Sequence, residues 1–374
     1  MKVLYLTQWY PWRHDAMEGL FVRNHAEAAV RQGIDVCVLY CREQAHAEPM
    51  EIVDQTTNGV RELYVYYSGS ASAALRRGRN EVFARWGKPD ICQVNVLSKY
   101  AFLAYELYRL HHIPYVLVEH WSGYLPANGD YLRNNRGLKK RLYEHVVRHA
   151  RCVLPVSHML QTAMQACGLR NDCWRPIHNV VYDCFYADVQ RPIAQPPYEL
   201  LHVSCFDEKA KNVRGILDAV KKLEQRRDDF RLRIIGTGID YEADKAYADS
   251  LHLSAGRVIF EGEKTPEEVC AAMQHAHLFV LFSRYETAGV VLAECMAVGL
   301  PFVATNVGGI PEMMNDDVGM LVESEDVQAL TDTIDKMLHR LPSYHEETIR
   351  HYGRDYSYDK VGEQLKKLYE SVLL

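Results

Sequence analysis

Residues 277–312, HLFVLFSRYETAGVVLAECMAVGLPFVATNVGGIPE, carry the pattern that decides the fold. A continuous apolar run, LFVLF, comes first, a helical segment starts near Gly289, and a second apolar run, LPFVATN, follows it. Continuous apolar runs are typical of strands that are buried on both faces. A helix between two such strands indicates a parallel crossover, so the stretch predicts one unit of a parallel α/β sheet.

The same alternation extends along the chain on both sides of this stretch. Three earlier runs in this half are LLHVSCF, FRLRIIGTG and GRVIFEG, and the N-terminal half contains KVLYL, IDVCVLY, PDICQVN, PYVLVEH and RCVLPVS. Between the halves, residues 190–199 contain three prolines, which favour an extended linker. We therefore expect two Rossmann-like, doubly wound domains, residues 1–190 and 191–355. The amphipathic helix 356–374 could pack on either domain and is grouped with the first.

The carboxyl ends of parallel strands are where such domains bind ligands. Two of them in tandem are expected to face each other across a cleft, with the ligand held between them. The length of 374 residues fits two domains, and 48% hydrophobic with 25% charged residues excludes disordered, collagen-like and coiled-coil classes. The net charge of −6 argues against a protein that coats nucleic acid.

The cysteines and the lengths of the apolar runs indicate the compartment in which the protein lies. There are ten cysteines and no C-x-x-C pair, and Cys37, Cys92, Cys152 and Cys205 lie in or beside apolar runs. We expect them to be buried thiols in a reducing cytoplasm. No run approaches the roughly 18 apolar residues that cross a bilayer, and the N-terminal apolar run is too short for a signal peptide. A cytoplasmic protein is expected, at most associated with the inner face of the membrane.

The loop and helix after the strand at 278–282 supply an anion-binding pattern. A helix that begins near Gly289 presents unpaired N–H groups and about half a positive charge, and glycine lets an anion approach closely. Glu294 then lies about 7–8 Å along the helix, while Glu286 stays on the loop. Carboxylates accept hydrogen bonds from neighbouring sugar hydroxyls. The pattern therefore favours an elongated ligand such as a nucleotide sugar. For either glutamate alone, a solvated surface role is the simpler interpretation.

The stretch 277–312 resembles the E-x7-E signature of retaining, GT-B-fold glycosyltransferases of family 4, with Glu286 and Glu294 as the two glutamates. Weaker similarities extend over nearly the whole chain. They are Gly19 with the helix after it, VEH ending at His120, ARCVLPVS at 150–157, HNVV at 178–181 and VSCFDEKAKN at 203–212.

The resemblance implies a role for each matched residue. Glu294 would hold the ribose hydroxyls, Glu286 the donor sugar and Lys211 the diphosphate of a UDP- or GDP-sugar. Backbone groups at Gly289 and Val290 would complete the anion site, and Gly19 would let the first loop approach the phosphates. The loop 258–262, with Phe260 and Glu261, would contact the base, and His120 would position the donor sugar. For His120 the simpler alternative is a histidine bonded to nearby backbone at a strand end.

One position departs from the family pattern. Members usually carry an arginine six residues before the diphosphate lysine, and here that position is Cys205. The substitution removes a bidentate phosphate ligand, for which Lys209 could compensate.

The mechanism that the resemblance implies uses no metal and no cofactor. Lys211 and the helix terminus would stabilise the departing phosphate in place of a metal ion, and no Asp-x-Asp motif is present. Retention would follow from front-face attack, in which the leaving phosphate takes the acceptor proton.

Two basic stretches indicate a possible lipid-linked or glycan acceptor. Residues 75–88 and 133–151 combine lysines and arginines with apolar residues at helical spacing, which attracts anionic membranes. The alternative is an ordinary helix that buries its apolar side.

Three functions compete at this stage. The leading one is a hexosyltransferase in cell-surface polysaccharide assembly. A nucleotide-sugar-binding regulator without activity is the main alternative because of Cys205, and a sugar-nucleotide epimerase is the third. Measured turnover separates them.

Overall fold

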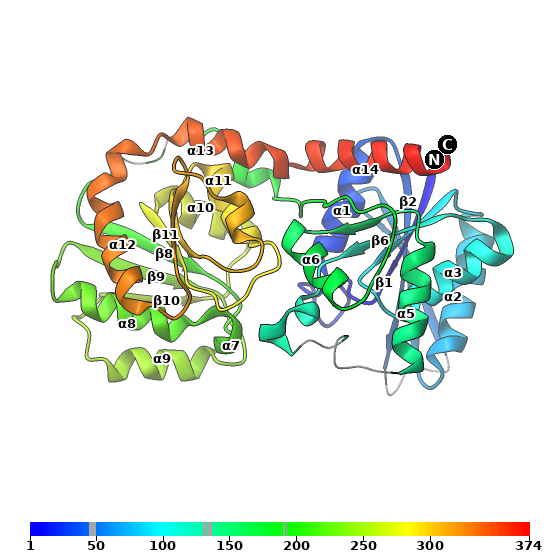
Figure 1. The fold of residues 1–374 in the computed structure, drawn as a ribbon, viewed down its shortest axis with the longest axis horizontal. Coiled ribbons are helices and arrows are strands. Elements are labelled where there is room, and N and C mark those ends of the chain that lie inside the picture. The colour runs from blue at the N-terminus through cyan, green and yellow to red at the C-terminus, as the bar shows by residue number, and fades with distance from the viewer. Residues whose placement is uncertain (45–49, 130–131, 133–136, 190, 192) are drawn as a thin grey trace. The chain divides into compact units, whose positions relative to one another are not determined.

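The computed structural model describes residues 1–374 except 45–49, 130, 131, 133–136, 190 and 192. Its chain divides into two compact units, residues 1–180 with 358–374, and residues 181–357. We call them unit 1 and unit 2. Each unit is a sheet with helices on both faces, so the prediction of two parallel-sheet α/β domains is confirmed (Figure 1).

Unit 1 contains a sheet with the strand order β3-β4-β2-β1-β5-β6-β7. Its strands are β1 (Lys2–Thr7), β2 (Asp35–Glu43), β3 (Met50–Thr57), β4 (Val60–Tyr67), β5 (Ile91–Asn95), β6 (Tyr115–Glu119) and β7 (Val153–Pro155). Its helices are α1 (Leu20–Arg31), α2 (Ala71–Arg85), α3 (Lys99–His111), α5 (Leu138–His149), α6 (His158–Ala166) and α14 (Tyr358–Leu373). Short 3-10 turns, η1 (Ser122–Tyr124) and η2 (Pro126–Asn128), follow β6.

An antiparallel hairpin at the edge of this sheet was not predicted. β3 pairs antiparallel with β4, whereas the other strand pairs of the sheet are parallel. Asn58 and Gly59 connect the two strands with φ values of 50° and 83°. An Asn-Gly pair between two strands is the usual signal of a tight hairpin, so the sequence does contain the evidence for it.

Unit 2 contains a wholly parallel sheet with the order β10-β9-β8-β11-β12-β13. Its strands are β8 (Tyr198–Val203), β9 (Phe230–Ile235), β10 (Val258–Gly262), β11 (Leu278–Leu281), β12 (Phe302–Thr305) and β13 (Gly319–Val322). Its helices are α7 (Glu208–Lys211), α8 (Val213–Glu224), α9 (Tyr241–Ser250), α10 (Pro266–His275), α11 (Val290–Val298), α12 (Val327–Arg340) and α13 (Glu346–Gly353). Short 3-10 turns are η3 (Asp183–Tyr186), η4 (Ile310–Met313), η5 (Leu341–Ser343) and η6 (Arg354–Tyr356).

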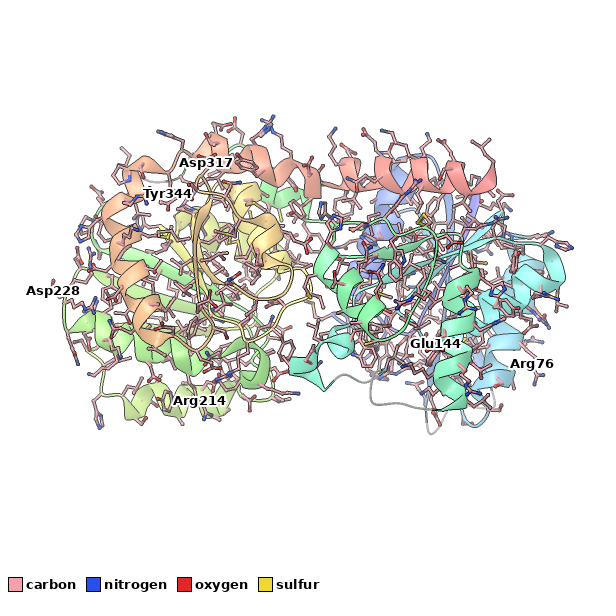
Figure 2. All side chains as sticks on the ribbon, in the orientation of Figure 1. Arg76, Glu144, Arg214, Asp228, Asp317 and Tyr344 are labelled. Carbon is pink, nitrogen blue, oxygen red and sulfur yellow. A yellow bond between two sulfur atoms is a disulfide. The ribbon has the colours of Figure 1, made fainter. Side chains whose placement is uncertain are left out.

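Both faces of the unit 2 sheet are buried. Along β11, Phe279 and Leu281 join one apolar cluster with α10 and α11, while Leu278 and Val280 join another with α8 and α12. Outside the clusters the helices are tied by ion pairs, as where Arg214 of α8 (Figure 2) donates to Asp244 at 2.9 Å. Burial on both faces explains why the strands are continuous apolar runs.

The boundary between the units lies before the proline-rich segment. Unit 2 begins at Val181 because Val181 and Phe185 pack into its core, beside α10 and α11. The described part of residues 190–199, interpreted from the sequence as a linker, therefore belongs to unit 2. At the other end of the chain, α14 packs along α1 in unit 1, where Gly362 approaches the backbone of Ala28 (Figure 1).

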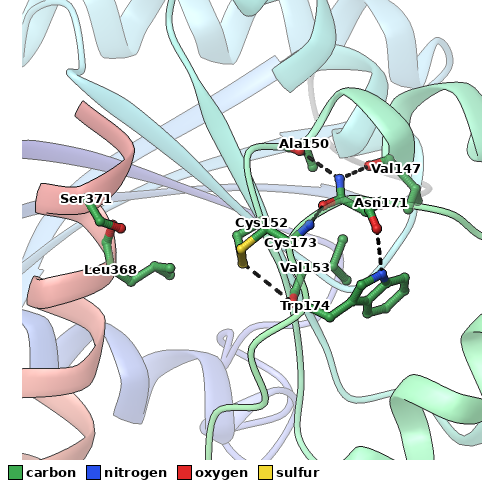
Figure 3. The surroundings of a disulfide bond; sticks show 9 residues. All are labelled: Val147, Ala150, Cys152, Val153, Asn171, Cys173, Trp174, Leu368 and Ser371. Atoms are coloured by element: carbon green, nitrogen blue, oxygen red, sulfur yellow. Dashed lines mark hydrogen bonds between the residues drawn. A yellow bond between two sulfur atoms is a disulfide. The ribbon is translucent and has the colours of Figure 1, made fainter. Parts of the chain in front are cut away.

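The expectation of buried thiols is wrong for two of the four cysteines named. Cys152 forms a disulfide with Cys173 (Figure 3), because residues 173–177 run beside β7 in the same direction, and Cys173 and Arg175 exchange backbone hydrogen bonds with Val153. Asn171 holds this segment in place, with its amide donating to two carbonyls at the end of α5. Cys205 is exposed beyond the end of β8, whereas Cys37 and Cys92 are buried. Cysteine usage therefore does not indicate a reducing compartment.

The basic stretches of the sequence have different environments. In α2, Leu75, Val82 and Trp86 are buried in unit 1, so its apolar side is used for packing. In α5, Val146 is buried, but Leu138 and Leu142 are 73% and 44% exposed. Across the described residues, no helix has the length and apolar character that crossing a membrane requires.

Candidate donor-binding and catalytic site

The start of α11 in unit 2 is an open helix N-terminus. Gly289 precedes the helix in the left-handed conformation, with φ 65° and ψ 49°, and no side chain caps the first turn. The first turn, which begins at Val290, also contains no acidic residue. Its N–H groups and the positive end of the helix dipole are therefore available to an anion.

Lys211 and Glu286, expected at different parts of a donor, contact each other directly. Lys211 Nζ lies 2.5 Å from Glu286 Oε1, and both side chains are mostly buried. Ser283 at the end of β11 donates to the same carboxylate oxygen at 2.9 Å. Burial alone would lower the pKa of Lys211, but the Glu286 carboxylate, together with Cys205 and Tyr285, outweighs burial and raises this pKa. An anionic ligand that binds Lys211 therefore competes with Glu286 for the ammonium group.

The position of Glu286 depends on the GG loop that follows β12. Gly308 has φ 58°, and a Cβ there would lie 1.8 Å from the Glu286 carbonyl oxygen. Only glycine permits this approach of two backbones. The loop that resembles the family's GG segment thus packs against the backbone of Glu286.

Glu294 on α11 differs from Glu286 because it has no partner. Among the described residues, no hydrogen bond or ion pair involves its carboxyl group, although part of the residue remains exposed. Desolvation by the surrounding protein raises the pKa of Glu294 to about 8. A carboxyl group without a partner is a ready site for a ligand's hydroxyl groups.

The other residues expected in unit 2 have varied surroundings. Phe260 packs its half-buried ring near Phe206 and Tyr241. Glu261 forms an ion pair with Arg233, which lowers the pKa of Glu261. Cys205 and Lys209 are exposed beyond β8, Lys209 on the short helix α7. Glu261 is thus already engaged by the protein itself.

In unit 1, His120 lies in a tight aromatic environment at the end of β6. It is 8% exposed, and its ring centre lies 4.2 Å from that of Phe21 and 5.5 Å from that of His25, both on α1. Neither ring nitrogen has a partner with good hydrogen-bond geometry in the described structure, although the Asn179 side chain lies close enough to interact with the ring and favours its charged form. Burial, reinforced by His25, lowers the pKa of His120 well below its usual value. The imidazole is therefore neutral, and the alternative of a backbone-bonded strand-end histidine is wrong.

Gly19 begins α1 much as Gly289 begins α11, with φ 67° and no side-chain cap. A Cβ on Gly19 would lie 2.4 Å from the Trp9 carbonyl group. The close approach that requires glycine here is thus to the protein's own backbone. A role for Gly19 toward phosphates stays a prediction.

Three further polar residues at this edge were not identified from the sequence. Asn179 and His25 are buried, and Asn179 Oδ1 and His25 Nδ1 have no described partner. Asn179 lies within the HNVV turn, so the resemblance to the family turn could have identified it. Glu119 is fully buried and accepts hydrogen bonds from the backbone of Leu97, His120 and Trp121, at 2.9–3.0 Å. These hydrogen bonds hold the loops after β5 and β6 in place at the carboxyl edge of the unit 1 sheet.

Two family models cover most of the chain. Residues 19–183 match Glycosyltransferase Family 4, and residues 188–354 match Glycosyl transferases group 1. Among curated relatives, N-acetyl-alpha-D-glucosaminyl L-malate synthase of Bacillus anthracis is 26% identical over 76% of this chain and 75% of its own length. TuaC of Bacillus subtilis, named for teichuronic acid biosynthesis, is 23% identical over 91% and 90%.

The fold is shared with solved glycosyltransferase structures. HepE of Anabaena, in complex with UDP and glucose, superimposes with a TM-score of 0.75 over 99% of this chain and 100% of its own, at 17% identity. This likeness concerns the fold alone. The two family models and the curated relatives show that the chain belongs to the group 1 glycosyltransferases, and the structural likeness shows the GT-B fold.

Proposed function

We propose that the protein transfers a hexose, with retention and without a metal ion, from a UDP- or GDP-sugar to a glycan or lipid-linked acceptor in polysaccharide assembly. The observation that carries this proposal is the Lys211–Glu286 ion pair beside the open N-terminus of α11, with Glu294 unpartnered on that helix. HepE was solved with UDP and glucose, and TuaC is named for a polysaccharide pathway, which supports the same choice.

Each residue of this group has a distinct part in the proposed reaction. The diphosphate takes Lys211 and the N–H groups at Gly289 and Val290, which stabilise the charge on the leaving group. Glu286, released from Lys211, accepts hydrogen bonds from the hexose, and Glu294 accepts them from the ribose. We assign Gly19 to the loop that approaches the phosphates and neutral His120 to the support of the anomeric centre. The acceptor oxygen forms the new bond as the sugar–phosphate bond breaks, and the phosphate oxygen takes its proton.

Turnover tests the proposal against its alternatives. Thermal shift with UDP-, GDP- and ADP-sugars identifies the donor, since a ligand at a hundred times its Kd stabilises by about 2.7 kcal/mol. Release of nucleoside diphosphate in the presence of EDTA, with an α-linked product from an α-linked donor, is the expected result. Isomerised donor would indicate an epimerase, and tight binding without turnover would indicate a regulator.

A contact with anionic membranes at the cytoplasmic face is proposed as part of the same function. Leu138 and Leu142 are exposed on α5 beside Lys139, Lys140 and Arg141. Exposed leucines among cations insert into anionic lipid surfaces. Copelleting with phosphatidylglycerol vesicles should be lost in Leu138→Ser/Leu142→Ser and kept in Leu110→Ser, a control at a leucine that is 64% exposed on α3. Equal binding by both variants would contradict the contact.

A further inference from the structure

A groove in unit 1 lies at the carboxyl ends of its strands. Its volume is about 760 Å³, and it is formed by the ends of β2 and β4 and the first turns of α3 and α5. The described residues that line it are Gln8, Cys41, Arg42, Glu43, Tyr67, Lys99, Phe102, Lys139 and Tyr143. It lies wholly within unit 1 and contains none of the residues assigned to the donor.

Lys99 brings an ammonium group into this groove without a counter-ion. It is half-buried, and its Nζ donates to the Tyr67 hydroxyl at 3.2 Å. No carboxylate of the described residues lies within 4.0 Å of that Nζ. Arg42 does not share this property because it pairs with Glu18 at 3.0 Å. A partly buried cation without a carboxylate favours an incoming anion.

Two helix N-termini add to the positive potential. α3 begins at Lys99 and α5 at Leu138, and neither has a side-chain cap or an acidic residue in its first turn. Ser98, which precedes α3, is 3% exposed, and its hydroxyl has no described partner. Lys139 lines the groove from the first turn of α5. Glu43 is the one carboxylate among the described lining residues, so the groove is cationic overall.

Part of the groove wall is aromatic. The rings of Phe102 and Tyr143 are stacked, with centres 5.3 Å apart and planes 13° apart. Aromatic walls with a few placed polar groups are typical of small-molecule sites. A second cavity of about 150 Å³ shares Gln8, Lys139 and Tyr143 with the groove and reaches Trp121, the neighbour of His120. The cationic groove is therefore continuous with the side of unit 1 where the reaction is proposed.

We propose that this groove binds an acidic group of the glycosyl acceptor, a carboxylate or a phosphate, and that Lys99 and Lys139 select it. The inference rests on the proposed transferase function and names the acceptor class that function uses. Carboxylate and phosphate share the chemistry that two ammonium groups recognise.

The test compares acidic and neutral sugars as probes on the full chain. Binding of D-glucuronate, D-glucose 6-phosphate and D-glucose is titrated by ligand-observed NMR. We expect at least one acidic sugar to bind about tenfold more tightly than glucose, and the better of the two identifies carboxylate or phosphate. Lys99→Gln should weaken that sugar at least fivefold, and Lys99→Gln/Lys139→Gln should abolish the preference over glucose. Lys140→Gln is the matched control, since Lys140 is next to Lys139 on α5 but does not line the groove.

Three outcomes of these titrations would overturn the inference. Equal binding of acidic and neutral sugars, or a preference that survives the double variant, would overturn the inference. So would a preference lost in Lys211→Gln, because the anion would then lie in unit 2. UDP titration of the same variants keeps the two proposals apart. Normal UDP binding without any acid preference defeats only the acceptor inference. Acid preference without UDP binding defeats the donor proposal.

Discussion

The carboxyl edges of the two sheets have similar helix starts but differ in whether their polar groups are paired. Both have a helix that starts at a left-handed glycine without a side-chain cap, Gly19 in unit 1 and Gly289 in unit 2. In unit 2 the nearby charges satisfy each other, since Lys211 pairs with Glu286. In unit 1 the buried side chains of His120 and Asn179 lie next to each other, but their polar atoms do not form a hydrogen bond of good geometry. A ligand at the unit 2 edge therefore competes with an existing ion pair, whereas a ligand at the unit 1 edge does not.

Substitution of Glu286 tests the unit 2 side of this comparison and has the largest expected effect. Glu286→Ala should lower kcat by about 10²–10³-fold, the usual loss when a group that stabilises the transition state is removed. UDP affinity should stay the same or increase, because Lys211 no longer has to leave a carboxylate. Steady-state kinetics and UDP titration measure both effects. Glu263→Ala is the control, at an exposed glutamate outside the site. Parental kcat in Glu286→Ala would contradict the assignment.

The two helix-start glycines should differ in what they tolerate. Alanine at Gly289 meets the Ile310 side chain at 3.3 Å, so Gly289→Ala should cost only the left-handed backbone, roughly 1–2 kcal/mol. Alanine at Gly19 would lie 2.4 Å from backbone atoms of Trp9, so Gly19→Ala should cost about 3 kcal/mol or more. Urea unfolding of both variants measures the difference. Equal losses would show that the two helix starts are equivalent.

His120 tests whether unit 1 keeps an unsatisfied group for function. His120→Leu should lower kcat about 10²-fold, within the range for a lost catalytic group. The same variant should unfold at equal or higher urea concentration, because it removes buried nitrogens that have no described partner. A variant that loses stability and keeps its activity would assign His120 a structural role instead.

The smallest effect concerns the proton on Glu294. Its pKa of about 8 means that the unliganded carboxyl is mostly protonated at neutral pH. Ribose hydroxyls donate stronger hydrogen bonds to the ionised carboxylate, so UDP binding should release this proton. Affinity should then rise as the pH increases from 7 to 8, by at most tenfold per unit, and level off above 8. Calorimetry in buffers of different ionisation enthalpy measures the released proton. The rise should be absent in Glu294→Gln, and a rise in that variant would assign it to another group.

The same proton affects folding in the opposite direction. Because the pKa of Glu294 is raised in the folded protein, folding favours the protonated form. Its contribution to stability is complete below the ordinary glutamate pKa and is lost as the pH rises through about 8. Nucleotide binding and folding therefore have opposite pH dependence at this one residue.

The fold was largely predictable because its signals are local. Apolar runs on strands such as β11, and the turn glycine at 289, identify the strands, helices and parallel class. The β3–β4 hairpin was missed, although the Asn58-Gly59 pair is a sequence signal for a tight hairpin. The Cys152–Cys173 disulfide and the segment beside β7 could not be predicted, because residues 173–177 pair with β7 without any periodic apolar pattern of their own.

The candidate site was predictable as a set of residues and not as a set of contacts. The spacing of Glu286 and Glu294 and the position of Lys211 identify them as candidates. The contact between Lys211 and Glu286 joins residues 75 positions apart, and only the fold of unit 2 brings them together. Buried partners such as Glu119 and Asn179 were missed because burial, and not residue type, gives them their importance.

A crystal structure of the chain with UDP tests the central claim most directly. The account predicts that Lys211 Nζ leaves Glu286 and contacts a phosphate oxygen at the start of α11, with the ribose hydroxyls on Glu294. An intact Lys211–Glu286 pair, with the nucleotide bound elsewhere, would contradict it.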